Sequence, residues 1–143
     1  YPAAIADYNW YIQIKNDNAD IYYDRGVCFL NLKQYQYAIT DFDKAIQLKP
    51  EFPKAYYNRG ITYDDTGNYQ KAIADYSTCI EQDPEFSDAY FNRGVIYFKM
   101  QMYEEALNDN LTAKGLGQKL DPRIIPTIQQ KLNEQKQLSS KVN

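Results

Sequence analysis

The sequence predicts an all-α protein built from pairs of helices that recur every 34 residues. Four residue types keep this interval: Gly26, Gly60 and Gly94; Tyr35, Tyr69 and Tyr103; Ala38, Ala72 and Ala106; and Asp41, Asp75 and Asp109. Apolar residues within each period are spaced as on one face of an α-helix. Pro50 and Pro84 follow the same interval and mark the end of a period. Self-similarity at a fixed period of this length is typical of repeat architectures.

The central period, residues 53–86, shows why each half is predicted to be a helix. Helical spacing relates two stripes of residues: Ala55, Tyr56, Arg59, Gly60 and Tyr63, then Ala72, Ile73, Tyr76, Cys79 and Ile80. Thr66-Gly67-Asn68 between them predicts a turn, and Asp83-Pro84 predicts the end of the second helix. Gly60 inside a helix costs about 1 kcal/mol relative to Ala. We therefore expect it to permit close approach of the paired helix at Ala72.

These positions resemble the signature of the tetratricopeptide repeat family. The matching positions are the large aromatics Tyr22, Tyr56 and Tyr90; Gly-x-x-Tyr at Gly60-Tyr63 and Gly94-Tyr97; the small residues Ala38, Ala72 and Ala106; the later aromatics Phe42 and Tyr76; the second small residues Ala45, Cys79 and Ala113; and Pro50 and Pro84. Phe29, Asn110 and Gln118 depart from the pattern. The resemblance covers about residues 1–120 and implies a right-handed α-solenoid of antiparallel helix pairs.

The period assigns the layout of the chain. Residues 1–18 form the second helix of a truncated unit, 19–52, 53–86 and 87–120 are full units, and 121–143 form a capping helix with a frayed tail from Ser139. Ile124, Ile128 and Leu132 recur every four residues in this last segment, and Pro126 is expected to delay or kink its start. Trp10 and Tyr11 depart from the later repeats, so they form an N-terminal surface or contact a missing helix.

Composition excludes several classes of function. The 143 residues suit one domain, and a net charge of −3 argues against nucleic-acid binding. The sequence has no apolar run long enough for a membrane span and no signal peptide, and the absent initiator Met indicates a fragment or a processed form. Zero His excludes a His-dependent triad or zinc site. Two unpaired Cys leave the compartment open but favour a reducing, cytoplasmic location.

No residue pattern predicts catalysis, a cofactor or a metal. Asp64 and Asp65 are adjacent, so on a helix they diverge by about 100° instead of converging on one bond. Gly115-Leu116-Gly117 lacks the spacing of a phosphate loop. Cys28 and Cys79 fall on inward repeat positions and are interpreted as small core residues. The chain is therefore predicted not to be an enzyme.

The resemblance implies that the first helices of successive units line a concave groove that binds peptides. The residues predicted to line it are Tyr23, Asp24 and Val27; Lys54, Tyr57, Asn58 and Ile61; and Asp88, Phe91, Asn92, Val95 and Phe98. They give a floor of aromatic and β-branched side chains with polar ends, and the Asn amides can hydrogen-bond a peptide backbone. The alternative interpretation is that they only cover the inner surface or pack against the chain's own terminus.

The best-known groove of this family is a carboxylate clamp for chaperone tails, and its pattern is largely absent. The clamp positions, which carry Lys, Asn and Arg in the family, hold Tyr23, Val27, Asn58, Asp88 and Asn92, of which only Asn58 matches. Acidic side chains on this face would repel a terminal carboxylate. The predicted partner is therefore a neutral to basic protein or peptide segment with apolar anchors.

Arg25, Arg59 and Arg93 are predicted to form structural ion pairs. Each lies 16 residues before the repeated Asp of its own unit and 18 after that of the preceding unit. Both partners belong to neighbouring helices, and the planar guanidinium can bond a carboxylate bidentately. The alternative is an Arg that contacts ligand.

The predicted function is protein–protein interaction, as an adaptor, scaffold or co-chaperone-like module. The first alternative is a structural spacer or a self-association element that pairs through its N-terminal half-unit, residues 1–18. The second is an enzyme whose site lies on residues outside this sequence.

Overall fold

The computed structural model describes residues 1–140, and every regular element in this range is an α-helix. The helices are α1 (Pro2–Ile14), α2 (Ala19–Asn31), α3 (Tyr35–Leu48), α4 (Pro53–Asp65), α5 (Tyr69–Gln82), α6 (Ser87–Lys99), α7 (Tyr103–Gly115) and α8 (Ile124–Ser140). The all-α prediction is confirmed. The chain divides into two units, Tyr1–Asp83 with α1 to α5 and Pro84–Asn143 with α6 to α8.

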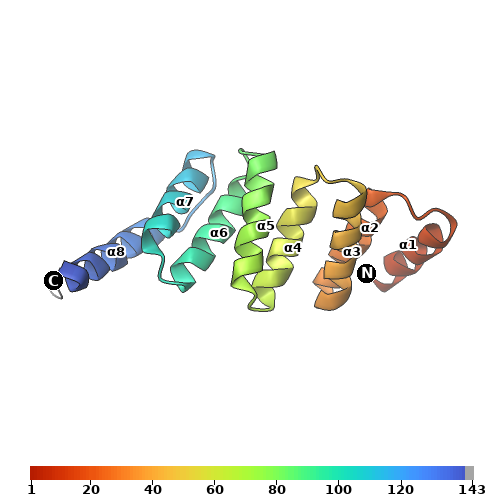
Figure 1. Ribbon diagram of the computed structural model, residues 1–143, viewed down its shortest axis with the longest axis horizontal. Helices are drawn as coiled ribbons and strands as arrows, with labels where there is room; N and C mark the ends of the chain where they lie inside the picture. The colour runs from red at the N-terminus through yellow and green to blue at the C-terminus, as the bar shows by residue number, and fades with distance from the viewer. Residues whose placement is uncertain (141–143) are drawn as a thin grey trace. The chain divides into compact units, whose positions relative to one another are not determined.

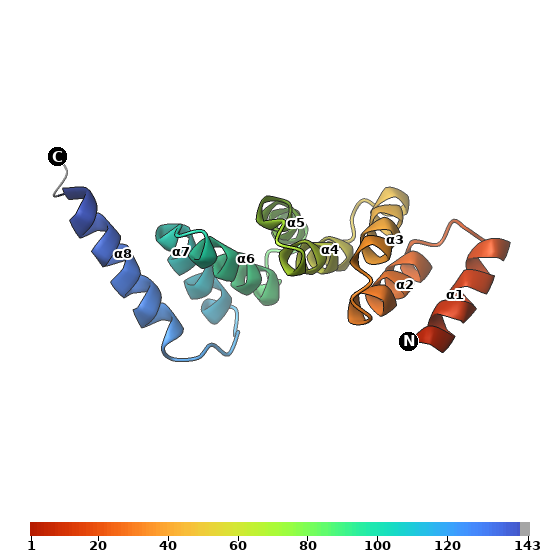
Figure 2. The same ribbon diagram turned by 90° about the horizontal axis from the view of Figure 1, so that it is seen from below.

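The first unit consists of two helix pairs preceded by a single helix. Helix α2 pairs with α3 and α4 pairs with α5, while α1 packs on α2 and α3 packs on α4 (Figures 1 and 2). Helices α3 and α5 end at Leu48 and Gln82. In each case the next residue precedes a proline and therefore disfavours helical backbone, as the sequence predicts. Asn18 caps α2 by accepting a hydrogen bond from the backbone N–H of Asp20.

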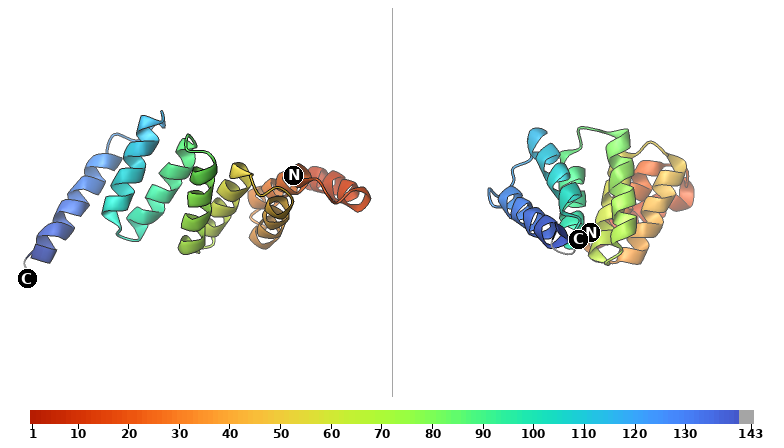
Figure 3. Two further views of the ribbon diagram at one scale, coloured as in Figure 1. Left: turned by 45° about the horizontal axis from the view of Figure 1, so that its top comes forward. Right: turned by 60° about the vertical axis from the view of Figure 1, so that its left-hand side comes forward.

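The second unit consists of the pair α6 and α7, with α8 packed on α7 (Figure 3). Ile128 and Leu132 are buried, as expected for the inner face of a capping helix. Pro126 does not delay this helix, because it lies in the first turn, where its missing N–H removes no helical hydrogen bond. The helix also includes Ser139 and Ser140, assigned from sequence to the frayed tail; the rest of that tail, 141–143, lies outside the described residues.

The repeated glycines pack closely against the paired helix. A Cβ at Gly60 would lie 2.8 Å from the ring of Tyr76, and one at Gly26 would lie 2.8 Å from the ring of Phe42. The nearest atoms to Gly60 therefore belong to Tyr76, and in the third pair a Cβ at Gly94 would also lie 3.4 Å from the backbone oxygen of Ala106, the counterpart of Ala72. Ala72 is fully buried, but the aromatic side chain four residues later reaches the glycine. The glycine thus makes room for a ring.

Helix α1 is the least buried helix of the first unit. None of its residues is buried, and the Trp10 side chain is 65% exposed, while Tyr11 is half-buried. Trp10 therefore lies on the surface of this unit.

Candidate functional site

The predicted site residues of the first unit belong to two helices in contact, α2 and α4, and together are called the α2–α4 surface. This α2–α4 surface comprises Tyr23, Asp24 and Val27 from α2 and Lys54, Tyr57, Asn58 and Ile61 from α4. Asp24 and Lys54 are exposed, and the others are half-buried. The surface thus combines accessible apolar side chains with exposed charges of both signs.

A hydrogen bond joins the two helices at the centre of the α2–α4 surface. The Asn58 amide Nδ2 donates to the Tyr23 hydroxyl oxygen at 2.8 Å. Burial raises the pKa of Tyr23 more than this hydrogen bond lowers it, so the phenol stays protonated at neutral pH. The sequence predicts that the amide of Asn58 is open to ligand. In the structure one of its two N–H groups is committed to Tyr23, which holds the side chain in place.

The aromatic side chains of this surface rest on the core behind them. The Tyr23 ring lies 4.9 Å from that of buried Phe52 and 6.1 Å from that of Phe42, centroid to centroid. Tyr57 packs on Tyr76 in the same manner at 5.8 Å. Offset and tilted ring contacts at these distances are favourable and restrict ring motion. The floor of the α2–α4 surface is therefore packed against the core.

Acidic side chains predominate on α2. Asp20 and Asp24 are both exposed, one turn apart. Burial by its neighbours and the nearby charge of Asp20 raise the pKa of Asp24. Lys54 on α4 is the single cation in the predicted set of site residues. This end of the surface therefore favours a cationic group over an anionic one.

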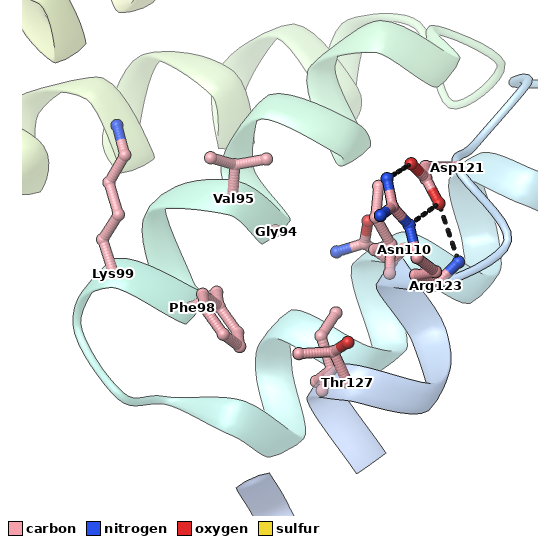
Figure 4. Close-up of a pocket in the computed structure, with 10 residues that line it drawn as sticks. Gly94, Val95, Phe98, Lys99, Asn110, Asp121, Arg123 and Thr127 are labelled. Atoms are coloured by element: carbon pink, nitrogen blue, oxygen red, sulfur yellow. Dashed lines mark hydrogen bonds and ion pairs between the residues drawn. The ribbon is translucent and has the colours of Figure 1, made fainter. Parts of the chain in front are cut away.

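The predicted site residues of the second unit belong to α6, and two of them line a pocket between α6 and α8. They are Asp88, Phe91, Asn92, Val95 and Phe98. Val95 and Phe98 line a pocket of about 420 Å³ together with Ile124, Thr127 and Ile128 of α8 and Asn110 of α7 (Figure 4). The sequence pattern did not predict the pocket residues of α7 and α8. The departure from the repeat at Asn110 was the available signal.

The repeated arginines are structural, as predicted. Arg59 donates from Nε to Oδ2 of Asp75 at 2.8 Å and from Nη2 to Oδ1 at 2.7 Å. Arg25 forms the same two bonds with Asp41 at 2.7 and 2.6 Å, and Arg93 forms them with Asp109 at 2.8 and 2.9 Å. These carboxylates are 3–5% exposed, so the pairs are largely shielded from water.

The contact that each repeated arginine of the first unit makes with the preceding helix differs from the prediction. In the first unit it involves the residue two positions after the repeated Asp: Arg25 donates to Asn9 and Arg59 donates to Asp43. Two residues on a helix turn the side chain by about 200°, so Asp41 faces its own pair and Asp43 faces the next. Burial lowers the pKa of Arg59, but the hydrogen bonds and charges of Asp75 and Asp43 outweigh burial and hold it above its ordinary value.

The chain has two cysteines, and neither forms a disulfide. Cys28 and Cys79 are buried and unpaired with each other, in agreement with their predicted place in the core. Among residues 1–140, no three His, Cys, Asp or Glu side chains gather as metal ligands would. No helix in the same range is both long enough and apolar enough to cross a membrane.

The fold and the ion pairs define a protein of stacked helix pairs with a fixed repeat. Models of the tetratricopeptide repeat match residues 19–52, 53–86 and 76–108. The chain belongs to the tetratricopeptide repeat family. Its fold class is therefore the α-solenoid of antiparallel helix pairs that the sequence predicted. No curated protein gives a significant match.

Solved structures with the same fold include proteins of several kinds. A crystal structure of MamA is 28% identical to this chain with a TM-score of 0.77, covering 78% of this chain and 66% of that one. The first repeat domain of Spaghetti (RPAP3), bound to the HSP90 peptide SRMEEVD, is 23% identical with a TM-score of 0.77, covering 81% and 94%. The Sgt2 domain from Aspergillus fumigatus is 24% identical with a TM-score of 0.74, covering 83% and 82%. This chain spans just under two thirds of the MamA chain.

Proposed function

We propose that this chain is a non-catalytic protein–protein interaction module that binds a peptide or protein segment, as an adaptor or scaffold does. The α2–α4 surface is the proposed contact surface of the first unit, and the exposed face of α6 is that of the second. The likeness to a repeat domain of RPAP3 bound to a peptide supports this kind of function. The observation that carries the proposal is the apolar floor of the α2–α4 surface, whose aromatic rings pack against the core.

The α2–α4 surface has the properties that peptide recognition requires. Val27 and Ile61 are half-buried, so each presents apolar area that a peptide side chain can cover. The bond between Tyr23 and Asn58 fixes two helices and two side chains before any partner arrives. Preorganisation of this kind reduces the entropy lost on binding. The side-chain oxygen of Asn58 remains suited to accept a backbone N–H of the peptide.

The charges favour a neutral to basic segment with apolar anchors. Asp20 and Asp24 are exposed on α2, and Asp88 is exposed on α6. An acidic tail would meet these carboxylates without the cations that neutralise such tails in the family. We expect the peptide SRMEEVD to show no saturable binding up to about 100 μM, a concentration that corresponds to about 5.5 kcal/mol. Low-micromolar affinity in fluorescence polarisation would contradict this partner chemistry.

Selection from a random peptide library displayed on phage tests the function directly. The full chain serves as bait, and selected peptides are then measured by fluorescence polarisation. We expect enrichment of neutral and basic peptides with aliphatic or aromatic residues, and at least tenfold weaker binding to Tyr57→Ala and Asn58→Ala. Gln70→Ala, an exposed residue of α5, is the matched control and should bind as the parent does. Equal affinity for all four proteins would place binding elsewhere.

A second candidate function is self-association through α1. Tyr1, Trp10 and Ile14 are 59%, 65% and 66% exposed, so α1 presents large apolar side chains to solvent. Exposed apolar groups of this size are typical of contact surfaces when they adjoin one another. Light scattering over a hundredfold range of concentration tests this function. A mass that rises with concentration and returns to the monomer in Trp10→Ser supports it, and a constant monomer mass contradicts it.

A further inference from the structure

The third helix pair lacks the ring that fills the first two. Phe42 and Tyr76 stand at the same repeat position and lie against Gly26 and Gly60, with the ring 2.8 Å from where a glycine Cβ would be. Asn110 occupies this position in α7, and its amide nitrogen lies 2.5 Å from the corresponding point at Gly94. The Asn110 amide contacts the glycine as the rings do. Its side chain is smaller than a ring, so it fills less of the space beyond the glycine.

The pocket in the second unit lies beside this substitution. It holds about 420 Å³, and Asn110 and Gly94 form part of its lining. Figure 4 shows Val95 and Phe98 on α6 and Thr127 on α8 around the same space. The walls are mainly apolar, and the exposed Asp121 and Arg123 at one edge are bonded to each other at 2.6 Å. A neutral, ring-sized group is therefore the guest that these walls suit.

Asn110 adds one specific requirement. The residue is 1% exposed, and its Nδ2 donates to the backbone oxygen of Ala106 at 2.8 Å. This bond fixes the orientation of the amide, because a flipped amide would bring two oxygens together. Within residues 1–140 the other amide atom, Oδ1, has no hydrogen-bond partner. Buried acceptors of this kind are costly unless a donor reaches them.

We propose that this pocket binds a phenol ring, supplied by a tyrosine side chain of the partner peptide. The ring fills the space that Phe42 and Tyr76 fill in the other pairs, and its hydroxyl donates to Oδ1 of Asn110. The source of the ring rests on the proposed function, since a peptide must supply it, whereas the affinity of the pocket for a phenol does not. Val95 and Phe98 were predicted as groove residues, so the pocket extends the contact surface of α6.

Two probes that differ only by one hydroxyl group test the hydroxyl requirement on the full chain. Binding of p-cresol and of toluene is measured by titration of ¹H–¹⁵N spectra, with the amides of Val95, Phe98 and Thr127 as reporters. We expect p-cresol to shift these amides and to bind about 3- to 10-fold more tightly than toluene, the ratio that one net hydrogen bond supplies. Equal affinities, or no shifts at these amides, would overturn the proposal without requiring any variant to fold.

Two variants and a second probe pair separate the parts of the proposal. Asn110→Leu keeps the size of the side chain and removes the acceptor, so the preference for p-cresol should vanish. Asn110→Tyr restores the residue found at Tyr76 and should abolish binding of both probes; retained binding would overturn the location. N-acetyl-tyrosinamide should bind at the same amides and more tightly than N-acetyl-phenylalaninamide. If p-cresol binds and N-acetyl-tyrosinamide does not, the tyrosine source is wrong. Loss of peptide binding in Tyr57→Ala tests the proposed function independently.

Discussion

Removing Asp75 should leave a shielded cation without its main partner, and the size of the effect follows from the structure. Asp75 is 5% exposed, and the Arg59 side chain that it binds is 18% exposed. Breaking a buried pair by deleting one partner costs about 3–5 kcal/mol. Arg59 keeps its bond to Asp43 and some contact with water, so Asp75→Ala should cost about 3 kcal/mol, the lower end of that range.

Asp43→Ala is the matched control, because it deletes the other carboxylate bound to the same guanidinium. The Asp43 side chain is 53% exposed, and ion pairs at such positions contribute about 0–1 kcal/mol. The pair of variants therefore separates the effect of burial from that of charge. A third variant, Arg59→Met combined with Asp75→Ala, removes the stranded cation while keeping an apolar side chain beside Tyr56 and Tyr63, and should recover part of the loss.

Equilibrium urea unfolding, followed by far-UV circular dichroism, measures these effects. A loss of about 3 kcal/mol lowers the midpoint by about 1.5 M urea when the slope is about 2 kcal/mol/M. Asp43→Ala should move it by less than about 0.5 M on the same basis. Equal shifts for Asp75→Ala and Asp43→Ala would refute the reasoning, since burial would then make no difference. A shift in affinity for selected peptides with unchanged stability would instead favour an Arg that contacts ligand.

Three further predictions concern the packing of the first unit. Tyr23→Phe removes the acceptor for Asn58 and should lower the free energy of unfolding by about 1 kcal/mol in urea titrations. Gly60→Ala should lower it by about 1–3 kcal/mol, although Ala favours helices, because its Cβ would lie 2.8 Å from the Tyr76 ring. Burial raises the pKa of the Cys79 thiol from 9.0 to about 12, so between these pH values the folded state keeps a proton that the unfolded state has lost. Stability should fall with rising pH in this window by up to about 1.4 kcal/mol per pH unit, and Cys79→Ala should remove that component.

Each of these predictions has an outcome that contradicts it. Unchanged unfolding in Tyr23→Phe would mean that the hydroxyl makes no net contribution to joining α2 and α4. A more stable Gly60→Ala would mean that the Tyr76 ring moves aside at little cost. Cys79→Ala keeps the packing pattern, because the equivalent positions of the other two repeats already carry alanine, Ala45 and Ala113. Identical pH dependence of the parent and this variant between pH 9 and 12 would contradict the shifted pKa.

Local sequence was sufficient for the helices and their ends. Helical spacing, the X-Pro dipeptides and the repeated period predicted the pairs because these signals act within a few residues or recur at fixed intervals. The partner of each arginine in its own pair was predictable for the same reason, since one 16-residue step relates Arg59 to Asp75. The second partner was not, because two nearby carboxylates, Asp41 and Asp43, differ only in the direction that the helix gives them.

The helix positions of the candidate site were predictable from the sequence. Which of its polar groups are free to bind a ligand was not. The repeat frame predicts Tyr23, Val27, Tyr57, Asn58 and Ile61 on one face. In the structure they belong to α2 and α4, and Asn58 is hydrogen-bonded to Tyr23. That Asn58 bonds Tyr23, 35 residues away, depends on how α2 and α4 approach each other. No local pattern encodes this distance.

The sequence by itself determined the family, the helix pairs and the pairing of each repeated Arg with the Asp of its own pair, because these follow from periodicity and from the preferences of single residues. The tertiary structure alone decided which polar groups are hydrogen-bonded within the protein and where a pocket remains between helices. Gly60 meets the Tyr76 ring, and Asn110 leaves an acceptor beside a pocket between α6 and α8. Hydrogen bonds and cavities depend on ångström-scale distances between helices, which packing sets and a one-dimensional pattern does not contain.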